Sequence, residues 1–235
     1  MKNLTLTICL TLAVLLGSTG TSWGADFNKG VAAFESGDYA TALRELKPLA
    51  EQGDAIAQVI LGVMYAEGSG VLQDYKTAVE WYTLAAEQGH AIAQVMIGQM
   101  YRNGDGVPQD YKTALKWYTL AAEQGDADAQ FHLGAMYYNG QGVPQNFKTA
   151  VKWYTLAAEQ GNAGAQFKLG GMYYIGRGVI KDEVYAHMWG NIAASNGNEN
   201  GGKLRDAVAK EMTPSQIEKA QDLARECVRK KYKGC

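Results

Sequence analysis

The strongest constraint on this chain is a 36-residue period. The tetrapeptide Ala-Glu-Gln-Gly begins at residues 50, 86, 122 and 158, and Ala-Ser-Asn-Gly begins at 194, so each copy starts 36 residues after the last. Between these marks each unit runs A-x-A-Q-x-x-[LI]-G-x-M-Y, then a Gly-x-Gly-Val loop, then a second apolar segment. Such a period predicts stacked units, because one unit cannot bury its apolar faces alone.

Both segments of each unit have the spacing of an amphipathic helix. In the second segment of one unit, Tyr111, Ala114, Leu115 and Tyr118 follow i, i+3, i+4, i+7. Residues suited to begin and end this helix recur in register, the N-caps Asp74, Asp110 and Asn146 and the C-terminal glycines Gly89, Gly125 and Gly161. The sequence therefore predicts an all-α solenoid of about twelve helices.

A Gly-x-Gly turn ahead of a helix can also cradle a phosphate. Here the pair recurs in every unit, as Gly68/Gly70, Gly104/Gly106, Gly140/Gly142 and Gly176/Gly178. A nucleotide needs one such site, so we interpret these glycines as supplying positive φ in a loop between two antiparallel helices.

The segment "AQVMIGQMYRNGDGVPQDYKTALKWYTLAAEQG" resembles a Sel1-like repeat, the longer-looped relative of the tetratricopeptide repeat. The resemblance covers residues 50–193 as four repeats and implies a right-handed α-solenoid of antiparallel helix pairs. Ahead of it, "GVAAFESGDYATAL" has tetratricopeptide-like spacing, so 25–49 is expected to form an N-terminal capping pair. Residues 194–235 are expected to form a C-terminal helical cap, with a capping box at Thr213–Gln216.

Residues 1–24 have the pattern of a signal peptide. Lys2 precedes an apolar run from Leu4 to Gly17, and Ser22 and Gly24 suit cleavage before Ala25. The run is shorter than the about 20 residues of a membrane span. We expect a periplasmic or secreted protein with no membrane insertion after cleavage; an uncleaved anchor helix is the alternative. The formal net charge of −2 gives no electrostatic case for nucleic acid.

Two cysteines remain after cleavage, Cys227 and Cys235. Eight residues of continuous helix would separate them by about 12 Å, whereas a disulfide needs Cα atoms within roughly 7 Å. We expect a disulfide, which requires the helix to end and the chain to fold back near Gly234. Two free thiols, or a bridge between molecules, remain open. The basic run "RKKYK" at 229–233 complements a helix dipole or, alternatively, binds an anionic surface.

Comparing the repeats with one another separates architecture from a candidate binding surface. Four positions of the first helix change character between units, and their spacing of i, i+4, i+7, i+11 makes one stripe. They are Ile56, Ile92, Asp128 and Gly164; Ile60, Met96, His132 and Lys168; Val63, Gln99, Ala135 and Gly171; and Glu67, Asn103, Asn139 and Ile175. In tetratricopeptide-like solenoids the corresponding helix lines the concave face, where peptides or proteins dock.

The resemblance thus implies a scaffold that binds a protein or peptide partner in the cell envelope. The partner-binding residues expected on the stripe and its flanks are Met96, Gln99, Arg102, Asn103, Phe131, His132, Tyr138, Asn139, Phe167 and Tyr174. The alternative is that these positions are tolerant surface. A regulator of a membrane signalling complex, as other Sel1-like proteins suggest, is a further possibility.

No catalytic constellation breaks the repeat symmetry. The histidines are His90, which lies in an inter-repeat turn and is expected to be a solvated turn residue, His187, and His132, which could contact a ligand. Some cysteine-rich relatives of the family carry a β-lactam-binding or β-lactamase label, but they have a cysteine pair in each repeat. This chain lacks those pairs and has neither Ser-x-x-Lys nor Lys-Thr-Gly. We expect no enzyme, cofactor or metal site; a β-lactam- or peptidoglycan-binding protein or hydrolase is the alternative.

Overall fold

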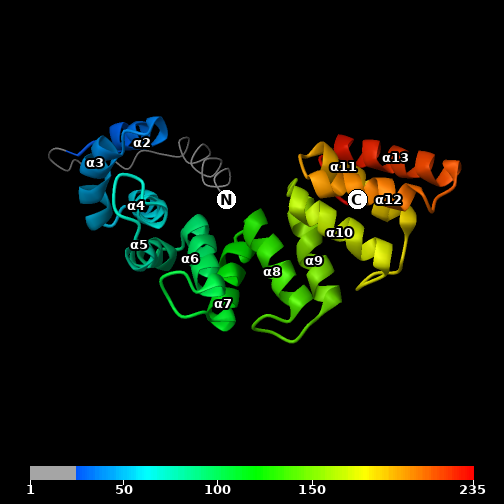
Figure 1. Ribbon diagram of the computed structural model, residues 1–235, viewed down its shortest axis with the longest axis horizontal. Coiled ribbons are helices and arrows are strands. Elements are labelled where there is room, and N and C mark those ends of the chain that lie inside the picture. The colour runs from blue at the N-terminus through cyan, green and yellow to red at the C-terminus, as the bar shows by residue number, and fades with distance from the viewer. Residues whose placement is uncertain (1–24) are drawn as a thin grey trace. The chain divides into compact units, whose positions relative to one another are not determined.

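The computed structural model describes residues 25–235, and within them it contains twelve α-helices and no strand (Figure 1). The predicted signal peptide lies outside these residues. The helices are α2 (Phe27–Ser36), α3 (Tyr39–Glu51), α4 (Ala55–Glu67), α5 (Tyr75–Glu87), α6 (Ala91–Asn103), α7 (Tyr111–Glu123), α8 (Ala127–Asn139), α9 (Phe147–Ala158), α10 (Ala163–Ile175), α11 (Glu183–Ser195), α12 (Glu199–Ala209) and α13 (Pro214–Arg229). The all-α prediction is confirmed. No helix in 25–235 is long and apolar enough to cross a bilayer.

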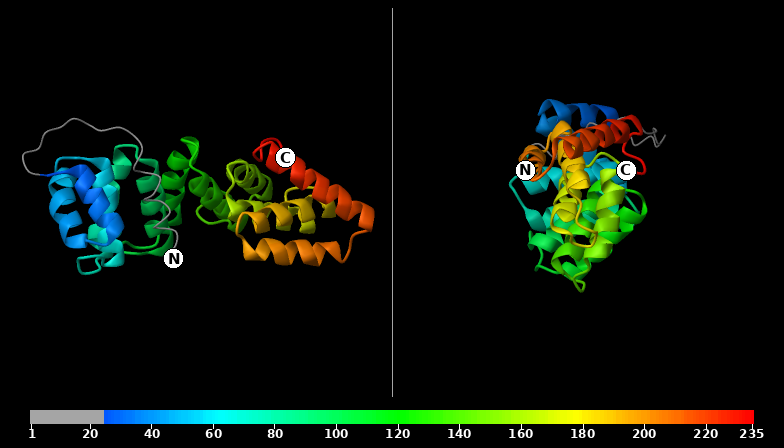
Figure 2. Two further views of the ribbon diagram at one scale, coloured as in Figure 1. Left: turned by 90° about the horizontal axis from the view of Figure 1, so that it is seen from above. Right: turned by 90° about the vertical axis from the view of Figure 1, so that its right-hand side faces the viewer.

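Internal contacts divide the chain into two compact units. The first ends at Trp117 and the second runs from Tyr118 to Cys235, so the division falls within α7. In the first unit, consecutive helices from α2 to α6 pack on one another. In the second, α8 packs on α9, α9 on α10, and α10 on α11, while α12 and α13 both contact α11 (Figure 2). Each unit is a stack of helix–loop–helix pairs.

Capping side chains start the first helix of each repeat. The carboxylates of Asp54 and Asp126 and the amide oxygen of Asn162 each accept a bond from the backbone N–H three residues on. His90, at the equivalent position, makes no capping bond, and its Nδ1 is buried without a partner. His90 thus lies in the expected turn but is half-buried rather than fully solvated, and burial lowers its pKa.

The loop glycines have two separate roles. The first glycine of each pair, such as Gly176 at φ 68°, ends the preceding helix in the left-handed conformation. The second also has positive φ, and it lies against the preceding repeat: a Cβ on Gly178 would stand 2.5 Å from the Phe147 carbonyl oxygen. Positive φ is the role predicted from sequence, whereas the close approach to α9 follows from the stacking.

Small residues on the first helices let buried tyrosines pack beneath them. A Cβ on Gly134 of α8 would lie 2.7 Å from the ring of Tyr154, which is 1% exposed on α9. Gly62 and Tyr82 are related in the same way, with 2.4 Å between the added Cβ and the ring. The alternation of glycine and tyrosine between paired helices thus sets how closely they approach.

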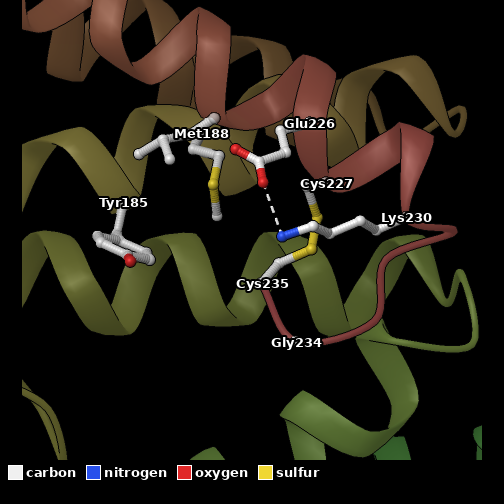
Figure 3. Close-up of a pocket in the computed structure, with 8 residues that line it drawn as sticks. Tyr185, Met188, Glu226, Cys227, Lys230, Gly234 and Cys235 are labelled. Atoms are coloured by element: carbon white, nitrogen blue, oxygen red, sulfur yellow. Dashed lines mark ion pairs between the residues drawn. A yellow bond between two sulfur atoms is a disulfide. The ribbon is translucent and has the colours of Figure 1, made fainter.

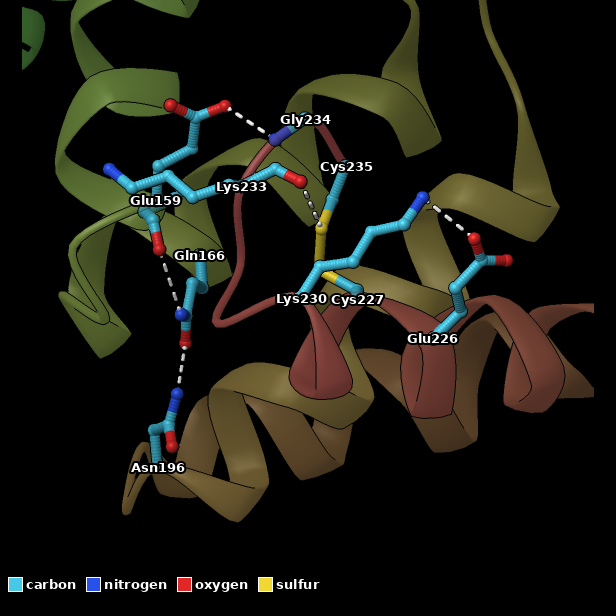
Figure 4. The surroundings of a disulfide bond; sticks show 10 residues. Glu159, Gln166, Asn196, Glu226, Cys227, Lys230, Lys233, Gly234 and Cys235 are labelled. Carbon is cyan, nitrogen blue, oxygen red and sulfur yellow. Dashed lines mark hydrogen bonds and ion pairs between the residues drawn. A yellow bond between two sulfur atoms is a disulfide. The ribbon is translucent and has the colours of Figure 1, made fainter.

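A buried glutamine joins neighbouring helix ends in every repeat. Gln166 is fully buried; its Nε2 donates to the Ala158 carbonyl at 3.1 Å, and its Oε1 accepts from Asn196 at 2.9 Å (Figure 4). Gln58, Gln94 and Gln130 donate to the equivalent carbonyls of Ala50, Ala86 and Ala122. These carbonyls belong to the last turns of helices, where no partner exists within the helix. The invariance of this glutamine in the sequence therefore reflects architecture.

The C-terminal segment folds back from α13 onto the repeats. α13 begins with the predicted capping box of Thr213 and Gln216. After it ends at Arg229, Lys231 and Tyr232 adopt positive φ and reverse the chain, so Gly234 is not alone in making the turn. Cys227 and Cys235 form a disulfide with their Cα atoms 5.6 Å apart.

Two hydrogen bonds attach this segment to earlier helices. The Gly234 N–H donates to Glu159 at 3.0 Å, and the Tyr232 hydroxyl donates to Asn196 at 3.0 Å. Figure 4 shows Glu159 and Asn196 on either side of the buried Gln166. The tail thus closes over the end of α9, within the second unit.

Candidate partner-binding face

The expected partner-binding residues of the second unit lie on α8 and α10. We define the α8/α10 face as the side of these helices that carries His132, Asn139, Lys168, Gly171 and Ile175, which share the stripe spacing. Asn139 and Lys168 are exposed, and half of Ile175 is exposed, at 50%. A Cβ added to Gly171 would meet nothing within 4 Å, so the surface is open at the centre of α10.

Phe131 and His132 belong to an aromatic group beside this face. The His132 ring stacks on Tyr118 with centroids 5.0 Å apart and lies 5.4 Å from Phe131. Phe131 in turn lies 5.8 Å from the buried Tyr154 and packs against the core of the unit. Part of each ring therefore serves packing, and only the remainder is available to a partner.

Tyr138 forms a second aromatic group with Phe147 and Arg177. The two rings meet edge to face at 5.2 Å, at the junction of α8 and α9. The guanidinium of Arg177, in the loop after α10, lies 5.9 Å from the Tyr138 ring centre and 5.4 Å from that of Phe147. Its Nη1 also donates to the Tyr138 hydroxyl at 2.9 Å. One arginine thus links the fourth repeat to the third.

Phe167 and Tyr174 flank the face on α10. The ammonium of Lys168 lies 5.7 Å from the Phe167 ring centre. The Tyr174 hydroxyl donates to Glu211, and this bond raises the pKa of the tyrosine. Lys181 lies over the Tyr174 ring at 5.7 Å and forms an ion pair with Glu183 at 3.0 Å.

In the first unit the expected residues lie on α6. Met96, Gln99 and Arg102 are half-buried and Asn103 is exposed; Asn103 donates to Asp105 at 3.0 Å. The stripe does not extend to α4 as an exposed surface, because Ile60 and Val63 are only 2% and 4% exposed.

The burial of the α4 positions has a cause outside the repeats. The side chain of Phe34, on α2, packs against the clusters that contain Ile60 and Val63. The N-terminal helices therefore place in the core two positions that the repeat comparison assigned to the stripe.

Sequence comparison between repeats missed Arg177. Its equivalents are Ser69, Asp105 and Gln141, so a change of charge at this loop position was a visible signal. The position lies outside the helix stripe, and only the structure brings it against Tyr138.

Other possible sites are small or lack ligands. A cavity of about 110 Å³ lies beside the disulfide, between Tyr185, Met188 and Lys230 (Figure 3). Ligand pockets usually measure about 300–1,000 Å³. Within residues 25–235 no three His, Cys, Asp or Glu side chains are grouped as metal ligands.

Comparisons with known proteins identify the repeat. The Sel1 repeat family model matches four successive segments, 55–90, 91–126, 127–162 and 163–198. No curated protein matched the sequence significantly.

Solved structures agree with this match. A Sel1 repeat protein from Oxalobacter formigenes is 29% identical, with a TM-score of 0.69 over 82% of this chain and 88% of that one. The protective antigen c5321 of uropathogenic Escherichia coli, which displays an SLR fold, is 30% identical with a TM-score of 0.52 over 83% of this chain; the chain spans 50% of that antigen's length. A putative Sel1 repeat protein from Klebsiella pneumoniae shares the fold at 23% identity, with a TM-score of 0.51 over 77% of this chain and 89% of that one. The chain belongs to the Sel1 repeat family.

Proposed function

We propose that this chain is a non-catalytic, exported scaffold that binds an extended segment of a protein partner across its first helices. The Sel1 repeat fold is typical of protein-interaction modules. The observation that carries the proposal is the α8/α10 face. There the residues that differ between repeats remain accessible, while the invariant glycine, glutamine and methionine positions are buried.

The residue types on this face support partner binding, rather than a surface that merely tolerates sequence variation. Exposed Ile175, the half-buried Phe131 and Tyr138 rings and the open surface at Gly171 lie on adjacent helices. Aromatic and apolar groups gathered on one surface are a feature of interaction sites. The export part of the proposal rests on residues 1–24 and on the cysteine pair.

The test is capture of envelope proteins by purified 25–235, with a variant that blocks the face. Gly171→Trp adds a large side chain where space is open, so it should reduce capture while leaving the helical content unchanged. Leu156→Trp is the control, because Leu156 is also exposed, at 44%, but lies on α9. Equal capture by wild type and Gly171→Trp, with both folded, would reject this face.

The catalytic alternative has its own measurement. The purified protein should not hydrolyse the β-lactam nitrocefin, because no acylating motif is present in the sequence. Hydrolysis that disappears in His132→Ala would replace the scaffold proposal with an enzyme.

A further inference from the structure

We propose that the α8/α10 face selects an acidic partner segment, whose side-chain carboxylates bind Arg177 and Lys168. This inference rests on the proposed function and names the chemistry of its partner. It follows from two cations that have no carboxylate partner among residues 25–235, next to a surface open enough to admit a peptide backbone.

Arg177 is held in place before any partner arrives. Tyr138 and Phe147 contact its guanidinium, and one hydrogen bond to the Tyr138 hydroxyl fixes its orientation. A guanidinium has five N–H donors, and no ion pair or second hydrogen bond engages those of Arg177 within residues 25–235. A pre-oriented arginine loses little conformational entropy on binding a carboxylate, and it can bind both oxygens at once.

Lys168 supplies a second positive charge on the same face. It is exposed on α10, its ammonium lies 5.7 Å from the Phe167 ring centre, and within residues 25–235 it forms no ion pair. The carboxylates of the region already have partners: Asp128 accepts from Asn162 at 2.9 Å, Glu183 pairs with Lys181, and Glu211 accepts from Tyr174. None of these carboxylates is paired with Arg177 or Lys168 within residues 25–235, so both cations remain available to a carboxylate of a partner.

The surface between the two cations suits an extended chain. Lys168 and Arg177 are separated along α10 by Gly171, where no Cβ keeps a backbone away, and by Ile175, which offers an apolar contact. From Lys168 to Ile175 the helix rises about 10 Å at 1.5 Å per residue, and Arg177 follows in the loop, after Gly176 has ended the helix. An extended segment covers that rise with three to four residues at about 3.3 Å each. A segment with acidic residues about four positions apart would therefore reach both cations.

The described part of the first unit, residues 25–117, offers no such pair on α6. The corresponding positions on α6 are Met96, Gln99 and Asn103, and the loop position equivalent to Arg177 is Asp105, which accepts from Asn103. The preference for acidic segments is thus expected to reside in the second unit.

The experiment is selection from a displayed library of random twelve-residue peptides with blocked C-termini, using purified 25–235. The proposal expects enrichment of peptides rich in Asp and Glu, which bind less well as salt is raised. The double variant Arg177→Gln, Lys168→Gln should bind the selected peptides about tenfold or more weakly, since charge-assisted bonds are lost. Lys148→Gln with Lys152→Gln is the matched control, because both lysines are exposed on α9, and it should bind like wild type.

The remaining outcomes separate the two proposals. If the selected peptides are neutral or basic and Gly171→Trp weakens their binding, the acidic preference is wrong but the binding face stands. Acidic peptides that bind equally to both double variants would place their site elsewhere. Selection of no peptide at all would reject the face together with the inference.

Discussion

At the scale of single residues, two neighbouring glycines of α10 have opposite surroundings. A Cβ on Gly170 would lie 2.8 Å from Leu204 and 3.2 Å from the Ala186 carbonyl oxygen, whereas one on Gly171 would meet nothing within 4 Å. The equivalent pair in the third repeat is Gly134 and Ala135, so only the first position requires glycine.

Gly171→Ala should therefore stabilise the protein by about 0.5–1 kcal/mol, because alanine favours a helix and costs nothing in packing. Gly134→Ala should instead destabilise it by about 1–3 kcal/mol, because the added Cβ would overlap the buried ring of Tyr154. Urea unfolding of both variants measures the two free energies. If both substitutions changed the free energy of unfolding by the same amount in the same direction, the Tyr154 ring would have to move freely, contrary to the packing described.

The buried histidine of α11 predicts a loss of stability in acid. His187 is 3% exposed with no partner for Nδ1; burial lowers its pKa, the charge of Arg205 lowers it further, and Asp206 opposes both. The unfolded chain takes up a proton near the ordinary pKa of about 6.5. The folded chain takes it up only at lower pH. Stability should thus be unaffected at high pH and decline as pH falls below about 6.5.

His187→Leu should reduce this decline. The measurement is the melting temperature at pH 7.5 and pH 5.5, at about 0.1 M salt. His90→Asn is a second variant, because burial lowers the pKa of His90 as well. Its replacement should therefore also reduce the loss of stability in acid. An identical loss in wild type and His187→Leu would show that His187 does not contribute.

At the scale of helices, the buried glutamines explain how one pair is joined to the next. Replacing Gln166 with Leu removes one of the two bonds to the Ala158 carbonyl, which still accepts from the Gly161 N–H at 2.9 Å, and it leaves the half-buried Asn196 amide without this acceptor. The variant should therefore lose about 1–2 kcal/mol of stability. Gln145→Leu is the control: it removes a bond to the Tyr138 carbonyl at an exposed site and should change stability by less than about 0.5 kcal/mol. Similar losses in both would contradict a joining role.

The tail of α13 supports a second prediction at this scale. Closing the nine residues from Cys227 to Cys235 should stabilise the fold by about 2–3 kcal/mol, through restriction of the unfolded chain. Cys235→Ser should therefore unfold at lower denaturant than wild type without reductant, and at the same denaturant with it. Mass spectrometry of the protein isolated from cells without reductant decides whether the bridge forms, since two alkylatable thiols at Cys227 and Cys235 would exclude it.

At the scale of the whole molecule, the repeats predict tolerance to loss of a unit. Deleting residues 91–126 joins His90 to Ala127 and preserves the register of caps, loops and buried glutamines. Because each pair packs mainly on its neighbours, the shortened chain should keep its helical content per residue and unfold cooperatively, though at lower stability. Circular dichroism and denaturant unfolding test this. A chain without helix would contradict nearest-neighbour packing.

The sequence alone determined the helices, their caps, the loops and the period, because these depend on residues near one another in the chain. The all-α solenoid and its family followed from that repetition. The tertiary structure decided which faces stay open. Ile60 and Val63 vary between repeats like their equivalents, yet both are buried in clusters against which Phe34 of α2 packs. Arg177 becomes a candidate binding residue only because Tyr138 and Phe147 hold it. The periodicity of a sequence predicts that a segment is helical, whereas the exposure of its side chains depends on which distant segments pack against the helix.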